Sequence, residues 1–318
     1  MILVCGEALI DLFTQVDASS GPTLKPVIGG SPLNLAIGLA RLGTPAAFLG
    51  GVSTDYFGTL LTDTMKEEGV DVSLLKRTAR PTPLVLVSPD AHGHPSYTFH
   101  AHESAVQDVD LADVSGSLPS SVSALALGSY TLAVEPVGTA LLALEEREAQ
   151  RTVIALDCNL RPALVGPLHS WRQRIEGFAR CASIIKLSDE DFASGWSESA
   201  QPDDQAAAWL QLGVELVVMT HGAAGATAWH RSGRVTVPAL PVQVVDTVGA
   251  GDSFQAALLA RLAQNGLLSS LALSSLDRPP IVDAMRYASF AASLTCGRRG
   301  ADLPRRAEIE KLMGEGQE

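Results

Sequence analysis

Short apolar runs alternate with helix-length segments along most of the chain. The apolar runs have the length of buried strands and are bounded by turn-forming residues. We expect strands at residues 1–5, 46–51, 124–127, 153–157, 183–187 and 215–220, and helices at 32–42, 136–150, 171–180, 206–212 and 281–297, with another ending near 69. Apolar runs without polar alternation are typical of strands covered on both faces. The pattern therefore predicts an α/β protein with a parallel sheet and helices on both faces.

One region departs from this alternation. Residues 82–87 and 96–100 are short extended runs separated by a turn at 89–94, which predicts a β-hairpin without an intervening helix. A second hairpin-like pair is expected at 227–230 and 234–237.

The hairpin at 82–100 and the polar segment 14–25 predict a small β-rich element that stands off the α/β body. Such elements often act as lids. We assign the lid to about residues 12–26 and 80–105 of a single domain that spans 1–318. The segment 267–280 and the charged tail from Arg305 are expected to be loose.

The composition is that of a soluble globular protein. Of its 318 residues, 46% are hydrophobic and 18% are charged, which suits one large core. The formal charge of −12 argues against binding to nucleic acid or to an anionic membrane. The four cysteines are scattered without a Cys-x-x-Cys pair, which favours a reducing cytoplasm. No segment resembles a signal peptide or a membrane helix, and we expect a cytoplasmic monomer or homodimer.

The turn from Asp246 to Phe254 (DTVGAGDSF) is the strongest chemical signal in the chain. An apolar run at 242–245 predicts a strand before it, and a helical pattern follows it. Small residues at Gly249, Ala250 and Gly251 let the backbone approach a ligand, and the first amides of a helix attract an anion. Asp252 would then take a proton from a hydroxyl that attacks a phosphate. The alternative makes Asp252 only an N-terminal helix residue favoured by the helix dipole.

The usual nucleotide-binding motifs do not occur. The chain has neither G-x-x-x-x-G-K-[ST] nor G-x-G-x-x-G, which argues against a P-loop enzyme and a dinucleotide-binding domain. A second turn that could meet nucleotide phosphates contains Thr220, Gly222 and Gly225. The same turn is equally consistent with an ordinary β-turn.

Two polar clusters follow predicted strands. Asp157, with Asn159 and Arg161, offers groups suited to polyol hydroxyls and a phosphate. The cluster after Lys186 includes Glu190 and Asp191, which could hold Mg²⁺ through water, although acids at a helix start commonly just offset the helix dipole.

Histidines at 92, 94, 100 and 102 have a ligand-like spacing, but a hairpin with solvated histidines is the commoner explanation. No G-x-S-x-G or similar motif supports a nucleophilic hydrolase.

An early helix is marked by Gly29-Gly30-Ser31-Pro32, with Ser31 as the expected N-cap and Pro32 at the first helical position. Asn34 would project near the mouth of this helix, or it is simply a tolerated polar residue. The late helix 281–297 is rich in small residues, which taken alone favours core packing.

These residues together resemble the ribokinase/PfkB family of sugar kinases, and within it the bacterial and plant fructokinases. The resemblance covers nearly the whole chain. It is strongest in the turn 246–254 and in the early segment from Gly29 through Asn34 to Gly43, and it is supported by Gly6-Glu7 with Asp11 and by the cluster around Arg161.

The resemblance implies a three-layer α/β/α body with a small β lid, ATP with Mg²⁺ as phosphoryl donor, and a primary hydroxyl of a sugar as acceptor. Asp252 is then the catalytic base, and the amides at 249–251 form the anion hole. The residues implied to hold the acceptor are Asp11, Gly29, Gly30, Asn34, Phe99, Asp157 and Arg161.

The nucleotide is implied to contact Lys186, Thr220, Gly222, Gly225, Gly249 and Gly251, with the adenine against Ala288 and Ala292. K⁺ would bind carbonyls at Asp246 and Val248 and a late loop near 296–301.

The chain departs from the family pattern at two places. Ser188 and Asp191 stand where an Asn-x-x-Glu for Mg²⁺ is usual. Fructokinases tend to carry an arginine after the aromatic lid strand, where this chain has Ala101, with His100 or His102 as substitutes.

The expected reaction is the conversion of fructose to fructose 6-phosphate. The alternatives are a kinase for 2-keto-3-deoxygluconate, ribose or a nucleoside, and a regulatory protein that binds sugar or nucleotide without catalysis.

Overall fold

The computed structural model describes residues 1–17, 21–89 and 95–315. Its centre is an eight-stranded sheet in the order β14-β13-β12-β11-β10-β9-β1-β4. The strands are β1 (Ile2–Cys5), β4 (Ala46–Leu49), β9 (Ala124–Gly128), β10 (Val153–Asp157), β11 (Ile184–Ser188), β12 (Leu216–Thr220), β13 (Ala226–His230) and β14 (Gly233–Val237). Neighbouring strands from β4 to β12 are parallel, whereas β12, β13 and β14 pair antiparallel. The parallel sheet and the late hairpin are confirmed.

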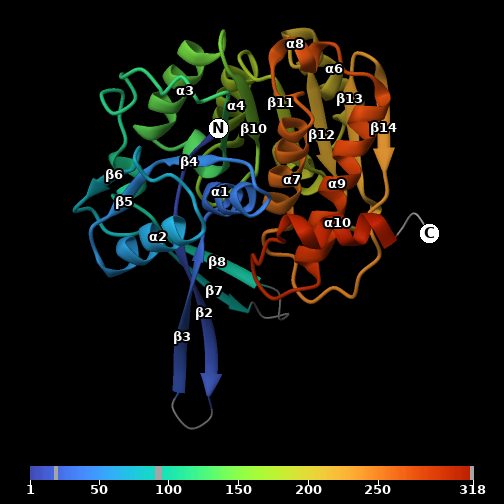
Figure 1. Ribbon diagram of the computed structural model, residues 1–318. Coiled ribbons are helices and arrows are strands. Elements are labelled where there is room, and N and C mark those ends of the chain that lie inside the picture. The colour runs from blue at the N-terminus through green and yellow to red at the C-terminus, as the bar shows by residue number, and fades with distance from the viewer. Residues whose placement is uncertain (18–20, 90–94, 316–318) are drawn as a thin grey trace.

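Helices cover both faces of this sheet (Figure 1). One core contains residues of α1 (Ser31–Arg41), α2 (Tyr56–Glu67), α7 (Ala250–Gln264), α9 (Arg278–Cys296) and α10 (Arg306–Glu315). The opposite core contains residues of α3 (Val137–Glu148), α4 (Leu168–Ala179), α5 (Asp189–Gly195) and α6 (Pro202–Leu212).

Each central strand sends alternate side chains into the two cores. In β1, Ile2 and Val4 belong to the first core and Leu3 and Cys5 to the second. Because both faces of the strand are buried, every position is apolar, which is why the sequence shows runs without polar alternation.

A second, four-stranded sheet stands away from this body in the order β3-β2-β7-β8. Its strands are β2 (Leu9–Asp17), β3 (Gly21–Gly29), β7 (Leu84–Pro89) and β8 (Pro95–His100). The antiparallel pairing of β7 and β8 confirms the predicted hairpin. Figure 1 shows β2 and β3 running side by side away from the α/β body. The shortest strands, β5 (Gly51–Ser53) and β6 (Lys76–Thr78), form a separate parallel pair.

Several local predictions are wrong. Residues 242–245 form no strand, since the Val245 amide donates to the Cys296 carbonyl and both Val244 and Val245 are exposed. The segment 267–280 contains α8 (Ser270–Ser274), capped by the Ser269 hydroxyl, and the tail from 305 contains the whole of α10. The predicted histidine spacing cannot be followed as a whole, because positions 92 and 94 lie outside the described residues.

The predicted cap of the early helix is also wrong. Gly30 is the N-cap of α1, with φ of 107°, so Ser31 and Pro32 are already helical. This difference leaves the Ser31 hydroxyl available for a contact across the molecule.

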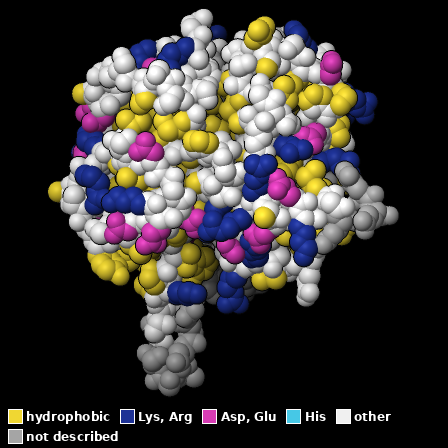
Figure 2. All heavy atoms as spheres, viewed as in Figure 1, with side chains coloured by type: hydrophobic (Ala, Val, Ile, Leu, Met, Phe, Trp, Pro, Cys, Tyr) yellow, Lys and Arg dark blue, Asp and Glu magenta, His cyan; other side chains and the backbone are white. Residues whose placement is uncertain are grey.

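The surface and the helices agree with the composition. On the face shown in Figure 2, Lys and Arg side chains are interspersed with Asp and Glu rather than gathered into one basic patch. Among the described residues, no helix is both long enough and apolar enough to cross a membrane.

Candidate active site

A cavity of about 1160 Å³ lies at the carboxyl ends of the parallel strands. Residues that follow β1, β10, β11 and β12 line it, as do the start of α7 and part of the small sheet. In open α/β sheets this edge is the usual place for ligands, because loops from several strands converge there. The volume is sufficient for two small molecules side by side.

The glycine turn lies at the amino end of α7, inside this cavity. Gly249 is the N-cap with φ of 79°, and a Cβ placed there would lie 2.7 Å from the Ala301 Cβ. Both the backbone conformation and the close neighbour therefore require glycine. The Ala250 amide donates to the Thr247 carbonyl at 3.2 Å, whereas the amides of Gly251 and Asp252 belong to the first helical turn, where a helix has no carbonyl partner for them.

Asp252 is held from both sides by α1. The Ser31 hydroxyl donates to its Oδ1 at 2.6 Å, and the Asn34 amide donates to its Oδ2 at 2.8 Å. The Asp252 side chain is buried but lines the cavity. These bonds fix the orientation of the carboxylate. Asn34 therefore has a specific partner and is not simply a polar residue that the helix tolerates, which was the alternative interpretation of the sequence. Ser31 is a site residue that the sequence interpretation missed.

Asp11 enters the cavity from strand β2 of the small sheet. Gly29 of β3 pairs with Leu9 of β2, and a Cβ at Gly29 would lie 2.3 Å from the Asp11 Oδ2 atom. Gly30 likewise approaches the Glu7 carbonyl, since its Cβ would lie 2.7 Å from that oxygen. Gly30 lines the cavity directly, while Gly29 acts by leaving room for the Asp11 carboxylate.

Glu7 is the second acid at this end of the cavity. Burial raises the pKa of Glu7 to about 7, although a hydrogen bond from Ser129 and the charge of Arg161 both lower it. Burial also raises the pKa of Asp11 to about 6, which the Arg161 charge opposes and the Asp252 charge supports. Among the described residues, the Oε2 atom of Glu7 has no hydrogen-bond partner, so it can bind a polar group of a ligand.

Two aromatic residues of the small sheet and Arg161 complete this end. Phe99 and Tyr97 of β8 line the cavity, and so does Arg161, whose Nη1 donates to the Leu160 carbonyl at 3.0 Å. His100 and His102 are exposed and are not among the described residues that line the cavity, so neither replaces the missing lid arginine.

Lys186 and Asp157 form a buried ion pair of 2.8 Å behind the glycine turn. Burial lowers the pKa of the Lys186 ammonium, but the nearby carboxylates, Asp157 first, outweigh burial and raise it overall. A Cβ at Gly251 would lie 3.0 Å from the Lys186 Nζ atom, so this cation adjoins the start of α7. Asp157 is not among the described residues that line the cavity, which changes its expected role from an acceptor contact to the partner of Lys186.

The turn after β12 forms the other end of the cavity, with Thr220, Gly222 and Gly225 in its lining. Gly225 has φ of 97°, and a Cβ there would lie 2.0 Å from the Val237 carbonyl oxygen. Packing against β14 therefore accounts for this glycine.

Helix α9 lines the cavity through Ser289, Ala292, Ser293 and Cys296. The prediction is wrong for Ala288, which is fully buried in the first core and is not among the described residues that line the cavity.

Comparison with known proteins identifies the family of this chain. The family model described as pfkB family carbohydrate kinase matches residues 1–308. The chain belongs to the pfkB carbohydrate kinase family. A fructokinase of Rhizobium leguminosarum bv. trifolii is 39% identical over 277 residues, which cover 87% of this chain and 84% of that protein.

Two solved structures of this kinase family share the whole fold. Fructokinase from Xylella fastidiosa with bound ATP superposes with a TM-score of 0.91 at 26% identity, over 100% of this chain and 99% of that chain. A double mutant of fructokinase from Vibrio cholerae O395 in a form bound to fructose, ADP and potassium ion gives a TM-score of 0.81 at 26% identity, over 98% and 97% of the two chains. The three-layer, ribokinase-like α/β fold of the pfkB kinases is thus confirmed.

Two acidic residues were predicted to hold Mg²⁺ through water in this pfkB kinase. Glu190 is exposed and lines the cavity. Asp191 caps α5, where its Oδ2 accepts the Ser188 amide at 2.9 Å and its Oδ1 accepts the Leu160 amide at 2.8 Å. Within the ranges that the structure describes, no group of three or more His, Cys, Asp and Glu side chains is placed to hold a metal ion.

The segments predicted for K⁺ do lie together. The Cys296 carbonyl accepts the Val245 amide at 2.8 Å, and the Asp246 Oδ2 accepts the Gly300 amide at 2.8 Å. The Val248 amide donates to the Asp246 Oδ1 at 3.1 Å. The turn 245–248 and the loop 296–301 are therefore one connected structure beside the phosphate turn.

Proposed function

We propose that this protein is an ATP-dependent fructokinase that converts fructose to fructose 6-phosphate. The observation that carries the proposal is Asp252, which Ser31 and Asn34 orient at the amino end of α7 in a cavity that also contains Asp11. The fructokinases reported above support the same reaction. An intact, oriented base in this position argues against a regulatory protein that has lost catalysis.

In the proposed mechanism, Asp252 accepts the proton of the acceptor's primary hydroxyl as that oxygen forms a bond to the γ-phosphorus. The bond between the γ-phosphorus and the bridging oxygen breaks, and ADP leaves with that oxygen. The first amides of α7 and the Lys186 ammonium stabilise the negative charge on the transferring group. Mg²⁺ bound to ATP would neutralise phosphate charge, with Glu190 as the residue best placed to hold its water.

Asp11 and Arg161 would hold the acceptor's other hydroxyls, and the small sheet would cover the acceptor end and exclude water, which otherwise hydrolyses the donor. The nucleotide would lie between the turn at 220–225 and the stripe of α9. We expect K⁺ near the carbonyls of Asp246 and Val248 and the protein to work as a cytoplasmic monomer or homodimer.

The charges at the acceptor end favour a neutral sugar over a sugar acid. The Asp252 charge raises the pKa of both Glu7 and Asp11 there, and the Arg161 charge lowers both. Burial is the main cause of the raised pKa values of Glu7 and Asp11, about 7 and about 6, and the Asp252 charge adds to it, so burial and repulsion both disfavour further negative charge at this end. The carboxylate of 2-keto-3-deoxygluconate would add to this repulsion.

An assay that couples ADP release to NADH oxidation over fructose, ribose, 2-keto-3-deoxygluconate and a nucleoside tests the acceptor. We expect kcat/KM for fructose to exceed that of every other acceptor by about tenfold or more. Preference for any other acceptor would replace the fructose assignment. If no ADP were released with any of the four acceptors, the result would count against a kinase.

Replacing Gly29 with alanine tests the role of Asp11. Because the added methyl group would occupy the space of the Asp11 Oδ2 atom, the carboxylate must move. We expect KM for the acceptor to rise about tenfold or more, while KM for ATP stays nearly constant.

Gly116→Ala is the matched control for this variant, since nothing lies within 4 Å of a Cβ at that position. Equal rises in both KM values for Gly29→Ala would indicate a general disturbance and contradict the assignment of Asp11.

A further inference from the structure

The segment between α9 and α10, residues 297–305, forms the back wall of the phosphate turn. Ala301 lies where a Cβ of Gly249 would be, and the side chain of Leu303 lies 3.6 Å from the same point. Leu303 is buried and also fills the space beside Gly38 of α1, where a Cβ would lie 2.5 Å from its Cδ2. The position of this segment therefore sets the position of Gly249.

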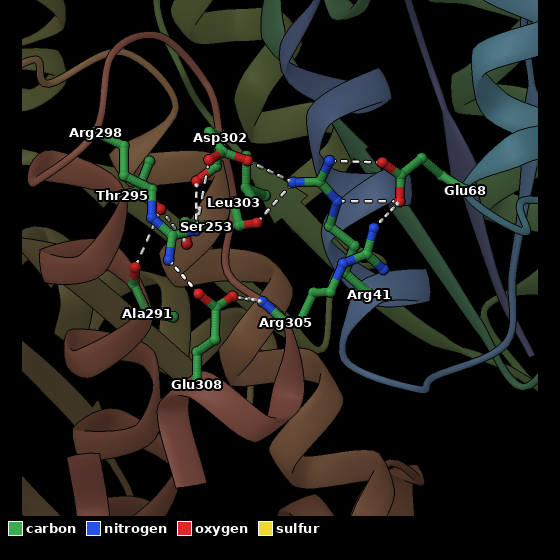
Figure 3. A network of polar contacts seen from close by, with 10 residues as sticks. All are labelled: Arg41, Glu68, Ser253, Ala291, Thr295, Arg298, Asp302, Leu303, Arg305 and Glu308. Atoms are coloured by element: carbon green, nitrogen blue, oxygen red, sulfur yellow. Dashed lines mark hydrogen bonds and ion pairs between the residues drawn. The ribbon is translucent and has the colours of Figure 1, made fainter. Parts of the chain in front are cut away.

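Arg41, the last residue of α1, holds this segment from the other side. Its Nη1 donates to the Leu303 carbonyl at 2.7 Å and to the Asp302 carboxylate at 3.0 Å. Its Nε and Nη2 donate to the two oxygens of Glu68 at 3.1 and 2.6 Å. Figure 3 shows the guanidinium between Glu68 on one side and Asp302 with Leu303 on the other.

The other arginines in Figure 3 hold the centre of the segment less closely than Arg41 does, since the Arg298 Nη1 lies 3.4 Å from the Asp302 carbonyl oxygen and 3.6 Å from the Asp302 carboxylate. Arg298 pairs with Glu308, and the Arg305 amide donates to the same carboxylate at 2.7 Å. The Arg305 side chain reaches Glu68 at 3.2 Å and is 63% exposed, whereas Arg41 is 17% exposed. Arg41 and Arg305 thus share one acid, but of the three arginines only Arg41 donates a hydrogen bond to the Leu303 carbonyl among the described residues.

We propose that Arg41 is a positioning residue for phosphoryl transfer, which acts by holding Leu303 and Ala301 against the Gly249 turn. The role needs a guanidinium, because one rigid group must reach a carboxylate and a carbonyl on opposite sides at once. A lysine ammonium offers a single point of contact. The proposal rests on the proposed kinase function, in which the Gly249–Gly251 turn receives the transferring phosphate.

Arg41→Met tests this role, since methionine keeps an apolar stem and removes the guanidinium. We expect kcat to fall about tenfold while KM for the acceptor changes less than about twofold, because displaced phosphate contacts are felt in the transition state. Arg41→Lys should show nearly the same loss, and Arg305→Met, which removes an ion pair to the same Glu68, should keep kcat within about twofold of the unsubstituted protein.

Hydrogen exchange measured by mass spectrometry gives a readout that does not depend on activity. In Arg41→Met, exchange should accelerate in peptides that cover 246–254 and 297–304 and stay unchanged in β10. An unchanged kcat, an equal loss in Arg305→Met, a matching rise in the acceptor KM, or unchanged exchange near Gly249 would each overturn the proposal. If the unsubstituted protein phosphorylates no acceptor, the kinase function fails and the exchange experiment still decides whether Arg41 holds the turn.

Discussion

Replacing Asp252 with asparagine is expected to lower kcat by about 100-fold or more, with the sugar Kd changed by less than about threefold. Asparagine has nearly the size of aspartate and keeps one oxygen to accept a bond from Ser31 or Asn34, so the turn should stay in place. It cannot accept the proton of the attacking hydroxyl. The loss should therefore appear in the chemical step, measured as kcat in the coupled assay, and not in sugar binding measured by calorimetry.

Asp63→Asn is a suitable control, because it makes the same chemical change at an exposed position of α2. It should leave both constants unchanged. An Asp252→Asn protein with full kcat would show that another group accepts the proton, and a loss confined to sugar binding would make Asp252 a binding residue instead of a base.

Replacing Glu145 with glutamine should make the protein markedly more stable at alkaline pH. Glu145 lies in α3, fully buried, and neither carboxyl oxygen has a hydrogen-bond partner among the described residues. Burial, with a smaller contribution from Glu146, raises its pKa from 4.5 to about 9. The folded protein therefore keeps the proton at neutral pH, while the unfolded chain releases it.

The sign of the effect follows from this difference. The folded pKa lies above the unfolded one, so the contribution of Glu145 to stability is fully present below about pH 4.5 and is lost progressively as pH rises towards about 9. At pH 8, which is 3.5 units above the unfolded pKa of 4.5, the loss is about 5 kcal/mol at 1.36 kcal/mol for each pKa unit. Glutamine has no proton to release and should escape this loss.

Urea denaturation at pH 5 and pH 8 measures the difference. The free energy of unfolding of Glu145→Gln should match that of the unsubstituted protein near pH 5 and exceed it at pH 8. Glu146→Gln changes the adjacent, exposed residue and should have a small effect at both pH values. A Glu145→Gln difference that is the same at both pH values would show that Glu145 does not retain its proton.

The sheet and the phosphate turn could be predicted because their causes are local. The strand Val153–Asp157 is apolar at every position before its last residue, because helices cover both of its faces. The turn around Gly249 is specified by the backbone conformation that glycine alone adopts easily. In both cases a few consecutive residues carry the information.

The errors arise where a partner is distant in sequence. Val245 does not continue a strand because its amide is taken by Cys296, and Asp157 does not face the acceptor because Lys186 holds it. Ser31 resembles a helix cap locally but contacts Asp252, 221 positions away. Ala288 and Ala292 are alike in composition, and only the orientation of α9 decides which of them lines the cavity.

The connections between the two sheets have a mechanical consequence. β1 ends at Cys5 and β2 begins at Leu9, while β3 ends at Gly29 and α1 begins at Ser31. Glu7 and Gly30 lie in these short connectors and also line the acceptor end of the cavity. Rotation of the small sheet relative to the body would change the torsions of both connectors, so a molecule bound against Glu7 and Gly30 would resist that rotation. Binding in the acceptor site would therefore restrict the angle between the small sheet and the α/β body.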